Sequence, residues 1–198
     1  MSYPHILFIR HGETEWNAQA RLQGQQDIAL NATGEMQARH VGSILAGMKF
    51  KPNGWEIYVS PMTRTMRTFE LADEAYRAAT GQPLGTPAHD VRLKEVTFGD
   101  LEGMTLADLS DQEFADRRRD PWNFQPPNGE SYAQGARRAV EWLRERNKPT
   151  LVVSHGGICR GLRKEILSLT ASNAAKFHTP QGAVLQWRDN NETIHDTL

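Results

Sequence analysis

Short apolar runs alternate along this chain with longer segments in which apolar residues recur every three or four positions. The apolar runs have the length and β-branched content of buried strands. They lie at 5–10 (HILFIR), 56–60 (EIYVS), 149–155 (PTLVVSH) and, more weakly, within 86–95, ending near Glu95. The longer segments each have one apolar face and predict helices. These helices are expected at 33–48, from just after Pro61 to about 79, at 131–146, and from Gly156 to about 169.

Strands that alternate with helices are typical of α/β proteins. We therefore predict a three-layer α/β/α sandwich with a mostly parallel sheet of about six strands. The last two apolar runs, AVLQW (183–187) and TIHDT (193–197), flank RDNNE and predict a closing hairpin. The length of 198 residues predicts a single domain, 1–198.

One segment interrupts this alternation. Residues 105–108 (TLAD) match a capping box that would open a short helix. Residues 117–130 are polar and rich in proline, which predicts irregular structure. We therefore expect an excursion at about 104–130 that caps the substrate.

Composition argues against several classes of function. Charged residues make up 24% of the chain and the formal net charge is −1, so bulk electrostatics favour neither nucleic acid nor a membrane as a partner. The single cysteine, Cys159, excludes an intramolecular disulfide and a multi-cysteine zinc site. The N-terminus lacks the pattern of a signal peptide, and we expect a cytoplasmic protein.

Polar residues follow the candidate strands at four places. They are Arg10 and His11, then Ser60 to Arg64, then Glu95, and finally His155. In an open, mostly parallel sheet, ligands bind outside the carboxyl ends of the strands. We therefore expect these separate segments to contribute side chains to one pocket.

This set of residue types suits a phosphate ester. Arginines bind phosphate through paired, charge-assisted hydrogen bonds, and Gly12 and Gly156 would let backbone N–H groups approach an anion closely. A histidine with one unprotonated nitrogen can attack phosphorus. A carboxyl group beside it can protonate the leaving oxygen and then activate water. A second histidine, if protonated, would add positive charge around the transferring phosphoryl group.

The motifs around these residues resemble, in order, those of the histidine phosphatase superfamily, also called the phosphoglycerate mutase-like family. They are LFIRHGETEWN (7–17), SPMTRTMRT (60–68), RLKEVTFGDLEG (92–103), PNGES (127–131) and VVSHGG (152–157). One Arg-His-Gly tripeptide would be a weak signal, whereas several ordered motifs that extend from about residue 5 to 170 are specific.

The resemblance implies a role for each site residue. His11 would be the nucleophile that becomes phosphohistidine, and Glu95 would be the proton donor, with Asp100 and Glu102 as rival carboxylates. The implied phosphate ligands are Arg10, Arg64 and His155, with Asn17 and Gln23 in less direct contact. No metal and no organic cofactor is implied.

Because the family contains both hydrolases and mutases, the departures from the mutase pattern matter. Phosphoglycerate mutases typically have a tyrosine where Phe98 stands, a lysine where Leu106 stands, and often a threonine where Gln23 stands. A phenylalanine cannot donate a hydrogen bond and a leucine cannot pair with a carboxylate. The stretch between Glu95 and His155 is also shorter, which leaves less material to exclude water. These points favour a phosphatase.

The predicted function is therefore a phosphomonoester hydrolase that acts through phosphohistidine on a small-molecule phosphate ester. A phosphoglycerate mutase and an inactive phosphate-ester binder are the alternatives. RRRDPWNFQPP (117–127) resembles the arginine pair that grips the substrate carboxylate in mutases, although Arg117–Arg119 also fit a solvated charge run at a helix end. Substrate identity and oligomeric state stay open, with a homodimer as one alternative.

Overall fold

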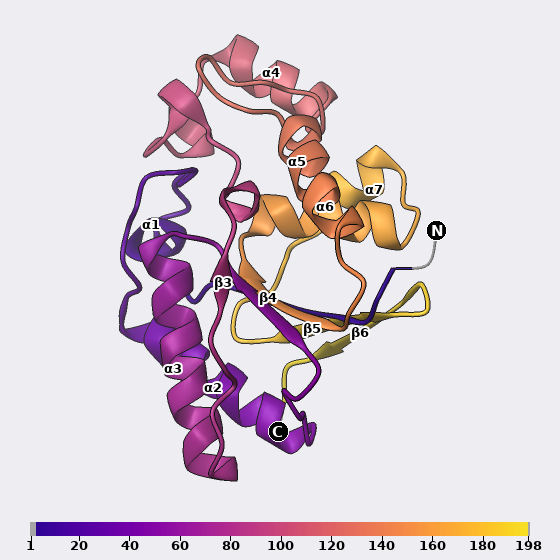
Figure 1. The fold of residues 1–198 in the computed structure, drawn as a ribbon. Coiled ribbons are helices and arrows are strands. Elements are labelled where there is room, and N and C mark those ends of the chain that lie inside the picture. The colour runs from indigo at the N-terminus through magenta and orange to yellow at the C-terminus, as the bar shows by residue number, and fades with distance from the viewer. Residues whose placement is uncertain (1–2, 198) are drawn as a thin grey trace.

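The computed structural model describes residues 3–197 and contains a six-stranded sheet of order β3-β2-β4-β1-β5-β6 (Figure 1). The strands are β1 (Ile6–Arg10), β2 (Glu56–Val59), β3 (Ala88–His89), β4 (Thr150–Ser154), β5 (Val184–Arg188) and β6 (Asn191–His195). β1, β4, β2 and β3 are parallel, whereas β5 pairs antiparallel with both β1 and β6. The predicted α/β fold with a mostly parallel sheet is confirmed.

Helices cover both faces of this sheet (Figure 1). One layer consists of α2 (Ala32–Gly47) and α3 (Thr63–Thr80), and the other of α5 (Tyr132–Arg144), α6 (Gly156–Ile166) and α7 (Ala171–Ala175). In β1, Leu7 and Ile9 are buried in the first layer's core, while Ile6 and Phe8 are buried in the second layer's core. Successive side chains of a strand point to opposite faces, so a strand covered on both faces is continuously apolar.

Local signals define the helix ends that position the site. Ser131 caps α5, and its side chain accepts from the N–H of Gln134 in a reciprocal capping box. α3 ends at Thr80 and is capped by Gly81, whose φ of 76° is left-handed and suits glycine. His155 is itself the N-cap residue of α6, so β4 passes into α6 with no intervening loop.

The weak run within 86–95 does contain a strand, but the expected strand end near Glu95 is wrong. Strand β3 covers only Ala88–His89. The side chain of Asp90 then accepts from the N–H of Arg92 and caps a 3-10 turn over Val91–Leu93. Because Asp90 offers the backbone this local bond, the chain leaves the sheet well before Glu95.

The excursion contains more helix than expected. The predicted capping box at 105–108 is present, with Thr105 and Asp108 as its members, around a 3-10 turn. A further helix, α4 (Asp111–Arg119), follows, so residues 117–119 are helical and only 120–130 are irregular. A second capping box, formed by Ser110 and Glu113, starts α4.

Three further differences concern shorter elements. The short helices α1 (Glu15–Ala18) and α7 were not predicted, and α6 ends at Ile166, three residues before the expected end near 169. The closing hairpin is present, but its turn consists of Asp189 and Asn190 alone. Both have positive φ, 51° and 60°, which matches the tight turn that the twist of two antiparallel strands favours.

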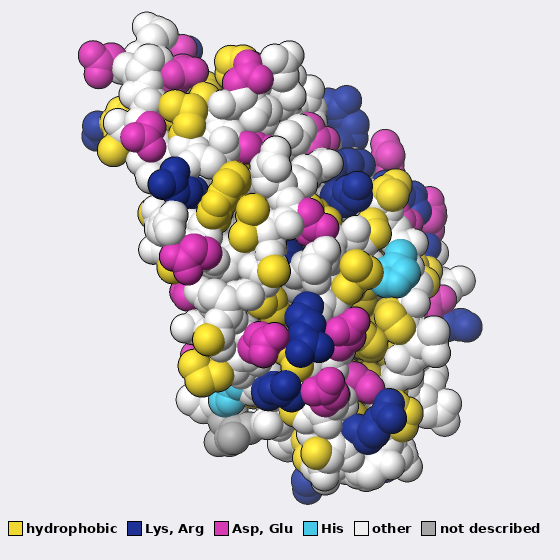
Figure 2. All heavy atoms as spheres, turned by 90° about the vertical axis from the view of Figure 1, so that its left-hand side faces the viewer, with side chains coloured by type: hydrophobic (Ala, Val, Ile, Leu, Met, Phe, Trp, Pro, Cys, Tyr) yellow, Lys and Arg dark blue, Asp and Glu magenta, His cyan; other side chains and the backbone are white. Residues whose placement is uncertain are grey.

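On the face shown in Figure 2, Lys and Arg side chains are interspersed with Asp and Glu side chains. Arg39 of α2 forms an ion pair with Glu74 of α3, and Arg77 forms one with Asp73 within α3. Mixed signs of this kind produce no extended field of one sign over that face. None of the helices within residues 3–197 has both the length and the apolar character needed to cross a membrane.

Candidate active site

The carboxyl ends of β1 and β4 bring two of the predicted site histidines side by side. The strands are parallel neighbours with Arg10 in register with Ser154, so His11 and His155 follow at the same level. The backbone N–H of His11 donates to the carbonyl oxygen of Ser154 at 3.0 Å. The centroids of the two imidazole rings lie 5.2 Å apart. These strand ends form one side of a common site.

A cavity of about 160 Å³ lies at this edge of the sheet. The predicted site residues that line it are Arg10, His11, Asn17, Gln23, Arg64, Glu95 and Gly156. His155, the remaining predicted site residue, is fully buried and contacts Arg64. The fold thus gathers the predicted set from segments that are far apart in the sequence.

His11 has one ring nitrogen that is free to act as a nucleophile. Nδ1 lies 2.7 Å from the carbonyl oxygen of Gly12, and since a carbonyl only accepts, Nδ1 carries the proton and Nε2 carries the lone pair. Burial lowers the pKa of His11 well below its usual value, and the charges of Arg64 and Arg10 lower it further. The imidazole is therefore neutral at neutral pH.

Gly12 allows the strand end to approach helix α2. A Cβ atom at this position would lie 2.3 Å from the carbonyl oxygen of Gly34. The N–H of Gly12 donates to Thr68 Oγ1 at 3.0 Å, so α3 also holds this turn. The glycine after His11 thus serves close packing, and its N–H has a protein partner.

Arg64 is fully buried and bridges several parts of the site. Nη1 and Nη2 donate to the carbonyl oxygens of Gln26 and Gly24 at 2.8 and 2.7 Å, and Nε donates to Nδ1 of His155 at 3.3 Å. Burial lowers the pKa of Arg64 to about 10, which still leaves it charged at neutral pH. A fixed positive charge therefore lies beside both histidines.

His155 was considered as a protonated, cationic group, but its surroundings favour the neutral form. Nδ1 accepts from Arg64, so Nε2 carries the proton and donates to Ser60 Oγ at 2.8 Å. Burial lowers the pKa of His155 well below its usual value, and the charge of Arg64 adds to this effect. In this structure the positive charge comes from the arginines.

Glu95 presents its carboxylate to the first turn of α6. The N–H of Gly157 donates to both carboxylate oxygens at 3.0 Å, and the N–H of Val96 donates to Oε1 at 2.9 Å. A Cβ atom on Gly157 would lie 2.4 Å from Oε1. Gly157 therefore belongs to the site, although only Gly156 was predicted.

The two rival carboxylates face other groups. Asp100 accepts from the Asn128 amide at the surface. Glu102 accepts from the backbone N–H groups of Gln25 and Gln26, from that of Phe98 and from Thr97 Oγ1. Neither lines the cavity, so Glu102 organises surrounding loops while Glu95 alone of the three reaches the cavity.

Gln23 and Asn17 form a small network at the cavity wall. Gln23 Oε1 accepts from Thr14 Oγ1 at 2.8 Å and from Asn17 Nδ2 at 3.2 Å. Gln181, a residue that was not predicted, donates from Nε2 to the carbonyl oxygen of His11 and to Asn17 Oδ1. Because Gln23 Oε1 is fully engaged, its amide nitrogen is the group left for a ligand.

The cavity walls contain donors that lack partners. Among residues 3–197, three buried nitrogen atoms on cavity-lining side chains have no hydrogen-bond partner: Arg10 Nε, Gln23 Nε2 and Arg160 Nε. Buried polar groups are normally satisfied, and these three are all donors. An anion with several acceptor oxygens is the ligand that would satisfy them.

Arg160 was missed by the sequence reasoning. It lies four residues after Gly156 on α6, and its guanidinium is 5.0 Å from the ring centre of Tyr132. Residues four apart lie on the same face of a helix, so Arg160 is on the face that carries Gly156. This spacing is the signal that could have identified it. His178 and Tyr132 also line the cavity, and no pattern around them indicated this.

The arginine run on the excursion lies in the last turn of α4. Arg119 pairs with Asp116 at 2.9 Å, and the guanidinium of Arg117 is 5.5 Å from the ring centre of Phe98. Arg117–Arg119 are not among the cavity-lining residues. Their position matches the interpretation as a charge run at a helix end.

No group of three or more His, Cys, Asp or Glu side chains in residues 3–197 is arranged to hold a metal ion. Cys159 is fully buried, and burial raises the pKa of its thiol to about 12. Its thiol is therefore protonated at neutral pH, and it packs among apolar residues as a core side chain.

The chain was compared with known families and proteins. The family model described as histidine phosphatase superfamily, branch 1, matches residues 6–195. A Bacillus subtilis protein named "Uncharacterized phosphatase PhoE" is 36% identical over 168 residues, which are 81% of this chain and 76% of that protein. The "Probable phosphoglycerate mutase GpmB" of Erwinia tasmaniensis is 35% identical over 176 residues, 84% of this chain and 76% of that protein.

A solved structure has the same fold. The crystal structure of phosphoglycerate mutase from Thermus thermophilus aligns with a TM-score of 0.69 at 28% identity, and the alignment covers 92% of this chain and 91% of that one. The relatives thus carry names of both phosphatases and mutases.

Proposed function

The chain belongs to branch 1 of the histidine phosphatase superfamily, and we propose that it is a phosphomonoester hydrolase that acts on a small phosphate ester through His11. The observation that carries the proposal is the cavity. It joins the lone pair of His11 Nε2, buried arginines and unpartnered donors in one space. A phosphoryl group placed there would meet a nucleophile and positive charge at once.

In the first step, His11 Nε2 forms a bond to phosphorus while the bond from phosphorus to the ester oxygen breaks. The Nδ1 proton stays on the ring, where its hydrogen bond to the Gly12 carbonyl stabilises the cationic phosphoimidazole. Arg10 and Arg64 stabilise the charge on the transferring oxygens. Glu95, once protonated, gives its proton to the departing oxygen, and an alcohol leaves.

In the second step, water attacks the phosphorus atom. Glu95, now ionised, accepts a proton from the water as the new oxygen–phosphorus bond forms. The bond from phosphorus to His11 Nε2 breaks, so inorganic phosphate leaves and neutral His11 returns. The Glu95 carboxyl group, which faces the first turn of α6, therefore serves both steps.

The test is release of inorganic phosphate from p-nitrophenyl phosphate by the protein and by His11→Ala. We expect turnover that disappears in the variant, and an acid-labile phosphate on His11 that mass spectrometry detects after rapid quenching. His40→Ala, on the outer helix α2, is the matched control and should keep full activity. Undiminished turnover in His11→Ala would refute the proposal.

A mutase is the second candidate, because relatives carry that name. Against it, the apolar ring of Phe98 lines the cavity, and Leu106 and Arg117–Arg119 do not. Incubation with phosphoglycerate and a phosphorylated primer separates the two: a hydrolase releases phosphate, whereas a mutase yields the isomer. Phosphate-ester binding with no turnover over a broad panel would instead indicate an inactive binder.

A further inference from the structure

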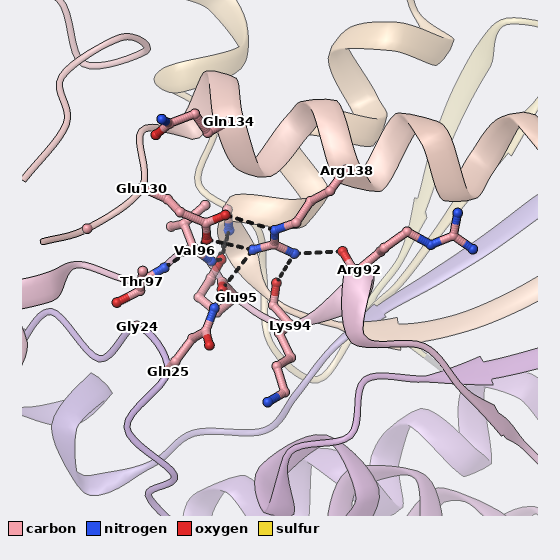
Figure 3. Close-up of polar contacts among 12 residues, drawn as sticks. Gly24, Gln25, Arg92, Lys94, Glu95, Val96, Thr97, Glu130, Gln134 and Arg138 are labelled. Atoms are coloured by element: carbon pink, nitrogen blue, oxygen red, sulfur yellow. Dashed lines mark hydrogen bonds and ion pairs between the residues drawn. The ribbon is translucent and has the colours of Figure 1, made fainter.

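Arg138 on α5 does not line the cavity, yet its guanidinium is bonded to the segment that carries Glu95 (Figure 3). Nη1 donates to the carbonyl oxygens of Arg92 and Lys94, each at 2.6 Å. Nη2 donates to the carbonyl oxygen of Glu95 itself at 2.9 Å. One side chain thus holds the carbonyl groups of Lys94 and Glu95 in this segment and that of Arg92 in the 3-10 turn before it.

Glu130 holds both Arg138 and the same segment. Its carboxylate accepts from Arg138 Nε at 3.0 Å and from Nη2 at 2.9 Å (Figure 3). The pair is mostly buried, with 19% of the Arg138 side chain and 25% of the Glu130 side chain exposed. Glu130 also accepts from the N–H of Thr97 at 3.2 Å and donates its own N–H to the Thr97 carbonyl at 2.8 Å. The bidentate ion pair between Arg138 and Glu130 fixes the orientation of the guanidinium as well as its distance.

The segment needs this support because it has no secondary structure of its own. Residues 94–98 belong to no helix and no strand. Their carbonyl groups therefore lack the partners that a sheet or helix would provide, and buried carbonyls require partners. Besides Arg138, Gln25 Nε2 donates to the Glu95 carbonyl at 3.0 Å. The backbone position of Glu95 thus depends on side chains from elsewhere.

The other end of Glu95 is held from α6, through the N–H of Gly157. Helices α5 and α6 are in close contact, since a Cβ atom on Gly161 of α6 would lie 2.7 Å from Cα of Ala136 of α5. Val96 fills the space beside them, because a Cβ atom on Gly135 would lie 2.3 Å from its Cγ1. Glu95 is therefore held at its backbone by α5 and at its carboxylate by α6.

We propose that Arg138, oriented by Glu130, is a positioning residue that keeps the Glu95 carboxyl group within proton-transfer distance of the leaving oxygen. Arg138 acts through Glu95 and does not touch the substrate. This inference rests on the proposed function, because it needs Glu95 to be the proton donor.

The experiment compares two leaving groups. An alkyl phosphate needs a proton on its departing oxygen, whereas p-nitrophenolate leaves without one. For Arg138→Met, we expect kcat/KM to fall about 10²-fold on the alkyl ester, within the range for a positioned acid, and only about threefold on the aryl ester. Arg138→Lys keeps the charge but not the fork, so it should restore only part of the loss. Arg137→Met, at the exposed neighbouring position on α5, is the control and should match the wild type on both esters.

A double variant separates positioning from folding. If Arg138 acts through Glu95, the alkyl-ester loss of Arg138→Met disappears when Glu95 is already Gln. Equal losses on both esters, or losses that add in the double variant, would overturn the inference.

If Arg138→Met fails to fold, judged by circular dichroism and by binding of inorganic phosphate, Glu130→Gln replaces it in the same cycle. If Glu95→Gln loses the same activity on both esters, the proposed role of Glu95 as proton donor is wrong. If Glu95→Gln loses more activity on the alkyl ester but Arg138→Met does not, only the inference about Arg138 is refuted.

Discussion

The floor of the site and the excursion at 104–130 are stabilised in opposite ways. The floor consists of the cavity-lining residues Arg10, His11 and Arg64, together with the buried His155 that Arg64 contacts. In the floor, side chains from distant parts of the chain contact one another, as Arg64 and His155 do across 91 positions of sequence. In the excursion, most polar contacts are local. The pairs Thr105–Asp108, Ser110–Glu113, Asp116–Arg119 and Asp120–Asn123 are each three residues apart.

This difference predicts that substitutions in the two regions have different effects. The floor residues are held by a sheet and by two layers of core, so their geometry is established before substrate arrives. The excursion makes its own caps and ion pairs, so its surface can change with little effect on the floor. We expect substitutions in the floor to affect the reaction itself. Substitutions in the excursion should have small effects on a minimal substrate, apart from those of Glu130, which holds Arg138 and the segment of Glu95.

The largest loss is expected for Arg64→Met. The change removes a fixed charge beside His11 and leaves the carbonyl groups of Gly24 and Gln26 without their donor. kcat/KM for p-nitrophenyl phosphate should fall about 10²–10³-fold, roughly 3–4 kcal/mol, as for loss of one positioned donor to the transition state. Arg77→Met, an exposed ion-pair residue on the same helix, is the control. A loss below tenfold would mean that the floor does not control the chemistry.

The next effect is a pH dependence of folding stability that originates in the floor. Burial lowers the pKa of His11 and of His155 in the folded protein, so the unfolded chain takes up protons first as the pH falls below about 6.5. Above that pH the two groups are neutral in both states and leave the free energy of unfolding unchanged. Below it, the free energy of unfolding decreases by up to about 2.7 kcal/mol per pH unit for the two groups. Urea unfolding between pH 7.5 and 5.5 measures this slope.

His155→Gln should remove about half of the contribution that these two groups make to the slope, because one of the two buried imidazoles is gone. Burial also lowers the pKa of His5 and of His178, and the variant keeps their contribution. The excursion contains no histidine, so substitutions there should leave the slope unchanged. A stability curve that is flat from pH 6.5 to 5.5 would contradict the neutral state assigned to the two imidazoles.

A smaller loss is expected for Gly157→Ala, which tests the position of the acid. The added methyl group would lie 2.4 Å from Glu95 Oε1 and must displace that carboxylate. We expect kcat for an alkyl phosphate to fall about 10–100-fold, roughly 1.4–2.7 kcal/mol. Gly47→Ala on α2 is the control, since a Cβ atom there meets nothing within 4 Å. Equal activity of the two variants would show that Glu95 is not held from Gly157.

The smallest effect is expected for the combined substitution of Arg118 and Arg119 by Ser. Arg119 contacts only its neighbour Asp116 among the ion pairs of residues 3–197, and neither arginine lines the cavity. The free energy of unfolding should change by less than about 0.5 kcal/mol, with kcat/KM for p-nitrophenyl phosphate unchanged. A large loss of activity would show that the excursion closes onto the reacting group.

Patterns within the sequence predicted much of the fold, because continuous apolar strands and amphipathic helices carry their signal locally. The ends of β1 and β4 and the start of α6 were predicted from such runs. The segment before Glu95 was not, since Asp90 diverts it into a turn through one side-chain bond. Helix α4 was missed because the capping box of Ser110 and Glu113 was not recognised. The last turn of the helix also falls in the polar stretch 117–130, whose composition favours irregular structure.

The predicted site residues converge because parallel strands expose their carboxyl ends at the same edge. That argument requires only the order of strands and the polar residues after them. It could not identify Arg160, His178 or Gln181, which reach the site from a helix face and a loop. Nor could it choose between the protonated and neutral forms of His155, since burial and the direction of each hydrogen bond decide them.

The sequence by itself therefore determined the α/β class, the strand ends and the residue types that meet there, because periodicity and order along the chain are local properties. The tertiary structure alone decided which carboxylate reaches the cavity, which nitrogen of each imidazole carries a proton, and how Arg138 holds the segment of Glu95. Each of these depends on distances between residues remote in sequence, and on the desolvation that arises only when the layers pack together.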